Sequence, residues 1–215
     1  VQTDDTDTDT GPMIDDVESR IHDEIGSIIE VSWNQTEEVP VWVSYRFDDD
    51  LWVQSPEAGG ASGAHSMLLL GIPYGSTVEY RLNWEDEDGI RETETRTTEN
   101  DPLPDHIPLP ISVDMNEDAI DSQANYIFTS MNADGTNEEY VVFIMDRRGR
   151  VVWAWDLPRF RLSLHPRLSH DGSDLLVDFN SFWYLYDGGS GSRVQRMNID
   201  GSIDELYDTP GLHHP

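Results

Sequence analysis

The sequence contains no cysteine and no lysine. The absence of cysteine excludes disulfides and thiolate chemistry. No run approaches the length of about 18 apolar residues that a membrane-spanning helix needs. All 13 basic residues are arginines, and 43 acidic residues oppose them, which gives a formal net charge of −30. Because so acidic a surface repels phosphate groups, the sequence predicts no nucleic-acid partner and no membrane insertion. The G-x-S-x-G motif of serine hydrolases and the glycine-rich phosphate loop are also absent.

The chain starts with a low-complexity acidic tail, VQTDDTDTDTGP. Alternating threonine and aspartate cannot bury apolar surface, so we predict a disordered tether over residues 1–12. No basic region followed by an apolar one is seen, so either the protein is cytosolic or a signal has been removed. Because such tethers often follow a cleavage site, we expect an exported protein in the periplasm or at the cell surface, with a lipid anchor on the removed N-terminus as one alternative. The aspartates from Asp5 to Asp16 approach the spacing of a calcium loop, but Thr10 stands where that loop needs glycine. We therefore predict no metal and no cofactor.

Residues 13–100 have the pattern of a β-sandwich of the immunoglobulin or fibronectin type III kind. Ile29, Val31 and Trp33 alternate with polar residues, as the residues of half-buried strands do. About seven short segments of this kind, separated by turn residues, fill the region. Its first part, from Met13 to Gly26, has apolar residues at spacings of three and four, which fits either a short helix or an irregular edge strand.

The segment LGIPYGSTVEYRL, residues 70–82, resembles the fibronectin type III module. It has the order of an apolar residue, a proline, a turn with glycine and threonine, and a tyrosine on an alternating strand. The resemblance implies that Tyr80 is the corner tyrosine, whose hydroxyl bonds to an upstream backbone group. Such modules usually act as spacers, so we assign no chemistry to this region.

Residues 101–110, DPLPDHIPLP, contain four prolines. Proline fixes φ and lacks the N–H that helices and sheet ladders need. We predict a stiff linker here, with a different kind of β-structure from residue 111 onward.

The segment YVVFIMDRRGRVVWAWD, residues 140–156, predicts an antiparallel hairpin, because two β-prone runs flank a turn that contains Gly149. The same order recurs at Met197–Ile203, where Gly201 lies 52 positions after Gly149. A repeat of about 40–50 residues made of short strands is typical of a β-propeller blade. We therefore predict an all-β protein in which the sandwich is followed by an incomplete propeller of about two blades at 111–215. A second sandwich with two similar hairpins is the alternative.

Histidines and arginines concentrate in the second part of the sequence. Six of the 13 arginines fall between Arg147 and Arg167, a local reversal of sign that suits an anionic substrate. Neutralisation of carboxylates on neighbouring strands is the alternative explanation. Because propellers bind ligands near the ends of their inner strands, the candidates for substrate binding are Arg159, Arg161, Arg167, His165 and His170.

The order of these features resembles the bacterial aryl sulfotransferase (arylsulfate sulfotransferase) family. They are the sandwich module, the proline-rich link, a D-x-x-G-x-V-V-W hairpin, a D-G-x-x-L-L strand and a final histidine pair. The matching residues are Asp146, Gly149, Val151, Val152, Trp153, Asp171, Gly172, Leu175, Leu176, His213 and His214. The resemblance implies a six-bladed propeller that transfers a sulfuryl group from a phenolic sulfate ester to a phenol through a sulfated histidine, without a nucleotide cofactor. Its small-molecule partners would be an aryl sulfate and a phenol.

His213 and His214 are the catalytic candidates. Neighbouring residues of a strand point to opposite faces, so one of the two would reach a central channel. Under the resemblance that histidine has a supporting role, because the nucleophilic histidine belongs to blades that follow residue 215. Pro215 departs from the acidic residue that the family commonly has there. We expect the N-terminal portion of an aryl sulfotransferase-like protein, inactive by itself. The alternative is a non-catalytic propeller for binding or scaffolding, with the sandwich as a spacer.

Overall fold

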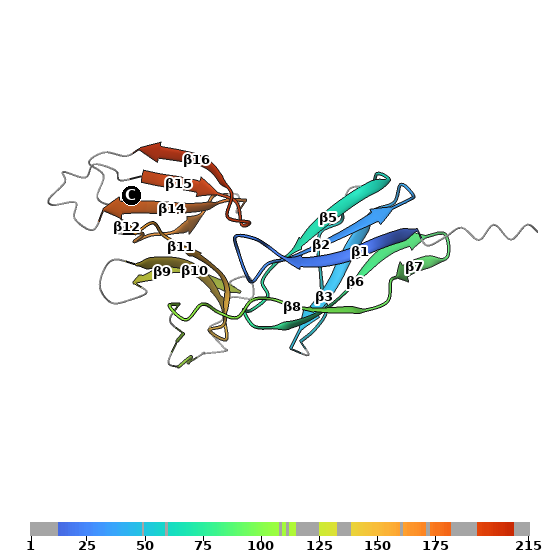
Figure 1. Cartoon of the computed structure of the whole chain (residues 1–215), viewed down its shortest axis with the longest axis horizontal. Helices are drawn as coiled ribbons and strands as arrows, with labels where there is room; N and C mark the ends of the chain where they lie inside the picture. Colours follow the sequence, from blue (N-terminus) through green and yellow to red (C-terminus); the bar gives the residue numbers. More distant parts are fainter. Residues whose placement is uncertain are drawn as a thin grey trace, which may run out of the picture. The chain divides into compact units, whose positions relative to one another are not determined.

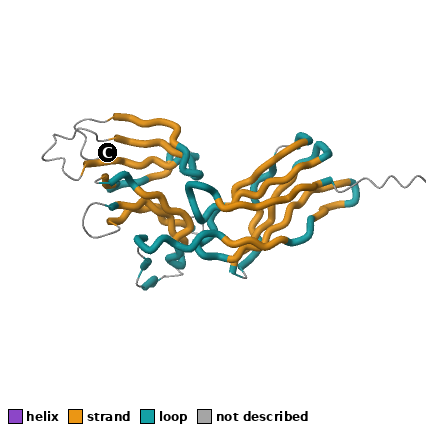
Figure 2. The backbone as a smooth tube through the Cα atoms, in the orientation of Figure 1, coloured by secondary structure: helices purple, strands orange, loops and turns teal. Residues whose placement is uncertain are grey.

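The chain is an all-β protein. Its structure is a computed structural model in which the described residues form strands and loops only (Figure 2). None of the described residues belongs to a helix that could cross a bilayer. The chain divides into two compact units: residues 1–20, 29–69 and 77–98 form the first, and residues 21–28, 70–76 and 99–215 form the second. The described residues are 13–48, 50–58, 60–107, 109–110, 112–114, 125–132, 139–159, 161–170, 173–181 and 193–208.

The first unit is an immunoglobulin-like β-sandwich with two antiparallel sheets (Figure 1). One sheet has the order β1-β2-β5, and the other has the order β4-β3-β6-β7, with β8 also paired to β6. The strands are β1 (Ile14–Ile21), β2 (Ile29–Gln35), β3 (Val41–Phe47), β4 (Val53–Gln54), β5 (Gly63–Leu69), β6 (Thr77–Asp86), β7 (Gly89–Glu92) and β8 (Arg96–Glu99).

Alternating side chains build the core of the sandwich. On β2, Ile29, Val31 and Trp33 are buried while their neighbours are not, which confirms the predicted half-buried strand. On the facing sheet, Tyr80 of β6 lies opposite Tyr45 of β3, and both rings are buried. The predicted hydrogen bond of the Tyr80 hydroxyl remains a prediction.

The helical interpretation of residues 13–26 is wrong, because Ile14–Ile21 form strand β1. The reason for the misleading spacing lies at Asp16, whose φ is +48°. A left-handed residue inside a strand shifts the alternation by one position. Ile14 and Val17 are therefore both buried, although they are three residues apart as on a helix.

The second unit contains two further antiparallel sheets (Figure 1). The first has the order β11-β10-β9. The second has the order β12-β14-β15-β16, with β13 also paired to β14. The strands are β9 (Tyr126–Asn132), β10 (Tyr140–Asp146), β11 (Val151–Asp156), β12 (Arg161–Leu162), β13 (Arg167–Leu168), β14 (Leu175–Ser181), β15 (Arg193–Met197) and β16 (Ile203–Asp208).

The loop between β10 and β11 closes the first predicted hairpin. The N–H of Gly149 donates to the carbonyl of Asp146 at 3.0 Å, and the N–H of Asp146 donates to the carbonyl of Arg150 at 2.9 Å. Gly149 has a φ of +77°, and the pairing of the two strands shifts by one residue beside the loop. This is a type I turn followed by a glycine bulge.

The loop between β15 and β16 repeats this geometry. The N–H of Gly201 donates to the carbonyl of Asn198 at 3.0 Å, and the N–H of Asn198 donates to the carbonyl of Ser202 at 2.9 Å. Gly201 has a φ of +87°, and the strand register again shifts by one residue. In each sheet the hairpin occupies one end of the strand order. The predicted recurrence of a hairpin is therefore confirmed in the backbone.

The proline-rich segment contributes to the core of the second unit. Ile107 is buried and packs with Val141, Phe143, Val151 and Ala154. The segment accordingly belongs to the second unit. The segment is thus held by apolar burial over part of its length, in addition to the stiffness of its prolines.

Candidate functional site

The first strand of the second sheet is interrupted. β12 and β13 are two residues each, and both pair with β14: Leu162 lies opposite Asn180, and Arg167 lies opposite Leu176. Residues 163–166 therefore stand opposite residues 177–179, four against three. The additional residue makes the chain leave the ladder between the two short strands. We refer to residues 161–168 as the edge segment.

A buried carboxylate holds the middle of the edge segment. Asp178 lies on β14 and is 5% exposed. Its Oδ1 accepts hydrogen bonds from the hydroxyl of Ser163 at 2.6 Å and from the N–H of His165 at 3.1 Å. Its Oδ2 accepts one from the N–H of Leu164 at 3.2 Å. These donors offset the cost of burying the charge and fix three successive residues of the interruption.

Strand β9 gives the edge segment a second attachment. The hydroxyl of Ser130 donates to the carbonyl of Ser163 at 2.5 Å. Ser163 is buried, whereas His165 two residues later is exposed. The edge segment is therefore anchored on its inner side and presents the imidazole of His165 to solvent.

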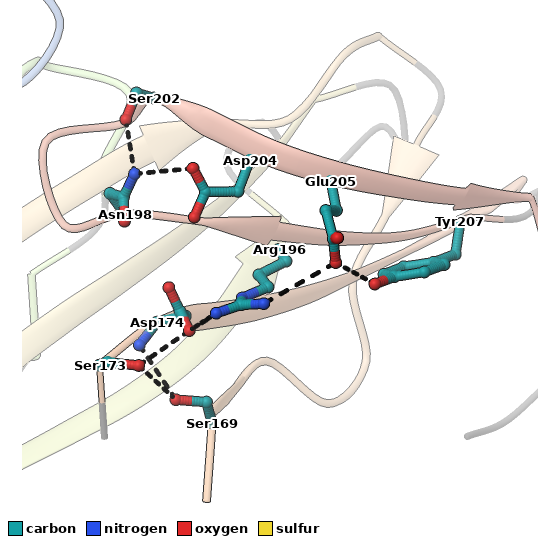
Figure 3. Close-up of polar contacts among 9 residues, drawn as sticks. All are labelled: Ser169, Ser173, Asp174, Arg196, Asn198, Ser202, Asp204, Glu205 and Tyr207. Carbon is teal, nitrogen blue, oxygen red and sulfur yellow. Dashed lines mark hydrogen bonds and ion pairs between the residues drawn. The ribbon is translucent and has the colours of Figure 1, made fainter. Parts of the chain in front are cut away.

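A second buried aspartate, Asp174, connects neighbouring serines with β15 (Figure 3). Asp174 accepts hydrogen bonds at Oδ2 from the Nε of Arg196 at 2.9 Å and from the hydroxyl of Ser173 at 2.9 Å. Its own N–H donates to the hydroxyl of Ser169 at 3.0 Å. The carboxylate raises the pKa of Arg196 above its ordinary value through this hydrogen bond, and its charge adds to the effect. Ser173 and Ser169, which neighbours His170 in sequence, are thereby tied through Asp174 to Arg196 of β15.

Strand β16 extends this polar network (Figure 3). Glu205 lies 3.8 Å from the guanidinium of Arg196 and accepts a hydrogen bond from the hydroxyl of Tyr207. That hydrogen bond raises the pKa of Tyr207, with smaller contributions from burial and charge. In the adjoining loop, Asn198 donates to Ser202 and to Asp204. Arg196 of β15 therefore connects Asp174, which immediately precedes β14, with Glu205 of β16.

The structure brings some of the predicted cations together and separates others. Arg167 pairs with Leu176, which in turn pairs with Arg196, so the two arginines share one face of the sheet. Arg161 pairs with Ser181, five positions from Leu176 along β14, and therefore belongs to the opposite face. His165 and Arg167 lie two positions apart on the edge segment, and both are exposed.

Arg159 precedes the edge segment by two residues. It lines a cavity of about 350 Å³ together with His106, Glu139, Tyr140 and Asp156. The Nε2 of His106 is 2.8 Å from the Oδ1 of Asp156. His213 and His214 lie outside the described residues, so their predicted role remains a prediction.

A larger cavity, of about 590 Å³, does not match the predicted substrate. Its lining includes the rings of Tyr74 and Trp155 and four carboxyl groups. Those carboxyl groups belong to Asp23, Glu24, Asp101 and Asp156. Such a lining disfavours a sulfate ester, because like charges repel at short range. Within the described part of the chain, no group of three or more acidic or histidine side chains is arranged to hold a metal ion.

Sequence reasoning missed the two aspartates that organise the site. Asp178 interrupts an apolar strand, LLVDFN, and a lone acid in such a strand is a signal of a buried, bonded carboxylate. Arg196 was also missed, because it lies outside the cluster from Arg147 to Arg167 and reaches Arg167 only through the strand register.

No known family model matches the chain, and no curated protein matches it. Among solved structures, the chain is similar to the twitchin kinase region from C. elegans, with 10% sequence identity and a TM-score of 0.30. The likeness covers 93% of this chain, and the chain spans about a third (33%) of the length of that structure. At this TM-score the likeness carries no argument about the fold or function of this chain.

Proposed function

We propose that this chain supplies the sandwich module and the first blades of an aryl sulfotransferase-like propeller. In such a protein a sulfuryl group passes from a phenolic sulfate ester to a phenol. The observation that carries the proposal is the recurrence of one hairpin geometry 52 residues apart, around Gly149 and Gly201. Recurrent strand units of about this length are the signature of propeller blades.

The sandwich supports the same proposal. Its strand orders, β1-β2-β5 and β4-β3-β6-β7, resemble those of a fibronectin type III-like module. The sequence of residues 70–82 resembles the same module. A spacer of this kind contributes no chemistry, so the reaction belongs to the second unit.

The edge segment supplies cations for an anionic substrate. Inner strands of a propeller border its central channel, and the edge segment begins the second sheet. His165 and Arg167 on this segment, with Arg196 on the same face as Arg167, offer N–H donors to sulfuryl oxygens. Their donors would be worth most once further blades exclude water from the channel.

The proposed chemistry has two balanced steps. A histidine nitrogen attacks sulfur and the S–O bond to the donor breaks, which releases a phenolate that takes up a proton. The acceptor phenol then loses its proton and attacks the sulfated histidine, which breaks the N–S bond and restores the imidazole. In this proposal the nucleophile lies on another blade, and His213 or His214 stabilises charge on the sulfuryl or leaving oxygen.

The test uses 4-nitrophenyl sulfate as donor and a phenol as acceptor. The 215-residue chain should release no nitrophenolate above background, whereas a longer protein that carries further blades should do so only with acceptor present. In that longer protein, His213→Ala and His214→Ala should have unequal effects, one lowering kcat by about 10²–10³. Equal rates close to wild type for both variants would contradict the catalytic assignment.

A non-catalytic binding propeller is the second candidate. It is favoured by the exposure of His165, Arg167 and His170, because catalytic groups are usually shielded from water. A longer protein that binds the aryl sulfate without turning it over would support this candidate against the first.

A further inference from the structure

We propose that Asp178 is a positioning residue. It holds the backbone of the edge segment so that His165 can contact an aryl sulfate. The inference rests on the proposed function and deepens it. The ligand has the chemistry of a sulfate half-ester, with one negative charge and three acceptor oxygens on sulfur. Asp178 itself would repel this ligand, so its role is exercised through the backbone that it fixes.

The interruption of the strand creates the need for such a residue. Between β12 and β13 the ladder to β14 is broken, so the backbone N–H groups of Leu164 and His165 have no carbonyl partner across the strand. Asp178 accepts both of them, at 3.2 Å and 3.1 Å. A buried N–H without a partner is costly. The carboxylate therefore replaces the missing ladder at the position of His165.

Only a carboxylate satisfies this arrangement. The hydroxyl of Ser163 and the N–H of His165 donate to Oδ1 of Asp178, and the N–H of Leu164 donates to Oδ2. An asparagine has one acceptor oxygen and one NH₂ group, which donates. In either orientation of the amide, at least one N–H would face another donor. Asp178→Asn thus removes the function at nearly constant volume.

A cation, Arg167, follows His165 two positions later on the edge segment. His165 and Arg167 flank Pro166, whose fixed φ limits how far the two residues can move relative to each other. Arg167 shares its sheet face with Arg196, which Asp174 holds at 2.7 Å and 2.9 Å. Two buried aspartates, Asp178 and Asp174, therefore fix two separate donors on one sheet.

The experiment has a ligand-free arm. We would measure amide hydrogen exchange by NMR in the intact chain, comparing wild type with Asp178→Asn. Exchange at Leu164 and His165 should be at least about tenfold faster in the variant, because their acceptor is lost. Unchanged protection at both amides would overturn the positioning role. Asp204→Asn is the matched control, since it makes the same substitution at an exposed residue of β16 and should leave both amides unchanged.

The second arm measures binding of 4-nitrophenyl sulfate to the wild type and to each variant by isothermal titration calorimetry. His165→Ala should weaken binding about tenfold, the effect of one charge-assisted hydrogen bond. Asp178→Asn should weaken it by a similar factor, and the double variant should be no worse than His165→Ala alone. Two outcomes would overturn the inference. In the first, the loss of affinity in the double variant equals the product of the two single losses. In the second, Asp178→Asn keeps wild-type affinity although His165→Ala binds more weakly.

The two failures can be told apart. If the wild-type chain gives no saturable response to 4-nitrophenyl sulfate, an aryl sulfate is not the ligand of the edge segment. The proposed binding of the substrate at this segment is then also contradicted. Fast exchange in Asp178→Asn would then still show that the aspartate fixes His165. Should Asp178→Asn fail to fold, Ser163→Ala replaces it, because this variant removes one donor to Oδ1 and keeps the carboxylate. It should give a smaller loss of affinity, about threefold.

Discussion

Trp153 is hydrogen-bonded to the loop of the second hairpin. Its indole Nε1 donates to the carbonyl of Ile199 at 2.7 Å, over a sequence separation of 46 residues. The indole is 2% exposed, and its ring meets the ring of Phe128 edge-on, with centroids 6.1 Å apart. One tryptophan therefore joins β11 of one sheet to the loop between β15 and β16 of the next.

Trp153→Phe should destabilise the second unit by about 1–3 kcal/mol, because the carbonyl of Ile199 loses its donor and ring volume is lost. The measurement is urea unfolding followed by circular dichroism. Trp155→Phe is the control, since the contact of Trp155 with Phe179 is a ring stack that phenylalanine can keep. A smaller loss for Trp153→Phe than for Trp155→Phe would contradict the role of the hydrogen bond.

Gly149→Ala should cost more stability than Gly201→Ala, although the two glycines occupy the same position in matching loops. Both have positive φ, which costs a residue with a Cβ about 1–2 kcal/mol. A Cβ on Gly149 would also lie 2.6 Å from a methyl of Val113, whereas a Cβ on Gly201 meets its nearest atom at 3.5 Å.

Thermal unfolding of the two glycine variants checks this order. Gly60→Ala serves as the control, because a Cβ there meets its nearest atoms at 3.5 Å and Gly60 is not among the glycines with positive φ. It should be close to neutral. Equal losses for Gly149→Ala and Gly201→Ala would show that the loop relaxes away from Val113.

Tyr74 should make the stability of the protein fall at alkaline pH. Burial raises its pKa above the ordinary value of 10.0, and hydrogen bonds with Ser27 and Ala154 act in the opposite direction. Since the folded-state pKa is the higher one, the stabilisation is complete below pH 10.0 and is lost as the pH rises through the folded value. Tyr74→Phe should flatten this alkaline decline in urea unfolding measured at a series of pH values. If the free energy of unfolding falls equally at alkaline pH in the variant and in the wild type, Tyr74 is not the cause of the decline.

Arg196→Ala should destabilise the second sheet more than removal of an exposed ion pair does. Its partner Asp174 has a side chain that is 6% exposed, and an unpaired buried carboxylate is costly. The loss should be smaller than for a fully buried pair, because the side chain of Arg196 is 41% exposed. Arg193→Ala is the matched control on the same strand. Its ion pair with Asp208 is exposed, with side chains at 45% and 75%, so the loss should stay within about 0.5 kcal/mol. Equal losses for the two arginines would contradict the importance of burial.

Local rules made the strands and hairpins predictable. Alternation along β2 requires only that one face be buried, and the loops at Gly149 and Gly201 require only a residue that tolerates positive φ. These signals lie within a few residues of each other in the sequence. The same locality explains the wrong helical alternative at β1, where the left-handed Asp16 gives a strand the spacing of a helix.

The candidate site was less predictable because its contacts are distant in sequence. Asp178 bonds to residues 13 to 15 positions earlier, and Asp174 reaches Arg196 22 positions later. Strands of two residues, such as β12 and β13, are too short for any period to appear. The sequence could therefore identify His165 and Arg167 as candidates, but the interruption that carries His165 emerges only from the pairing with β14.

The interruption also affects how the molecule behaves toward other chains. An unpaired sheet edge invites a foreign strand when it presents a regular row of N–H and carbonyl groups. Along the edge segment this row is broken: Leu164 and His165 turn their N–H groups inward to Asp178, and Pro166 has none. Strand addition, and the aggregation that follows from it, is therefore hindered at the same edge that exposes His165 to solvent.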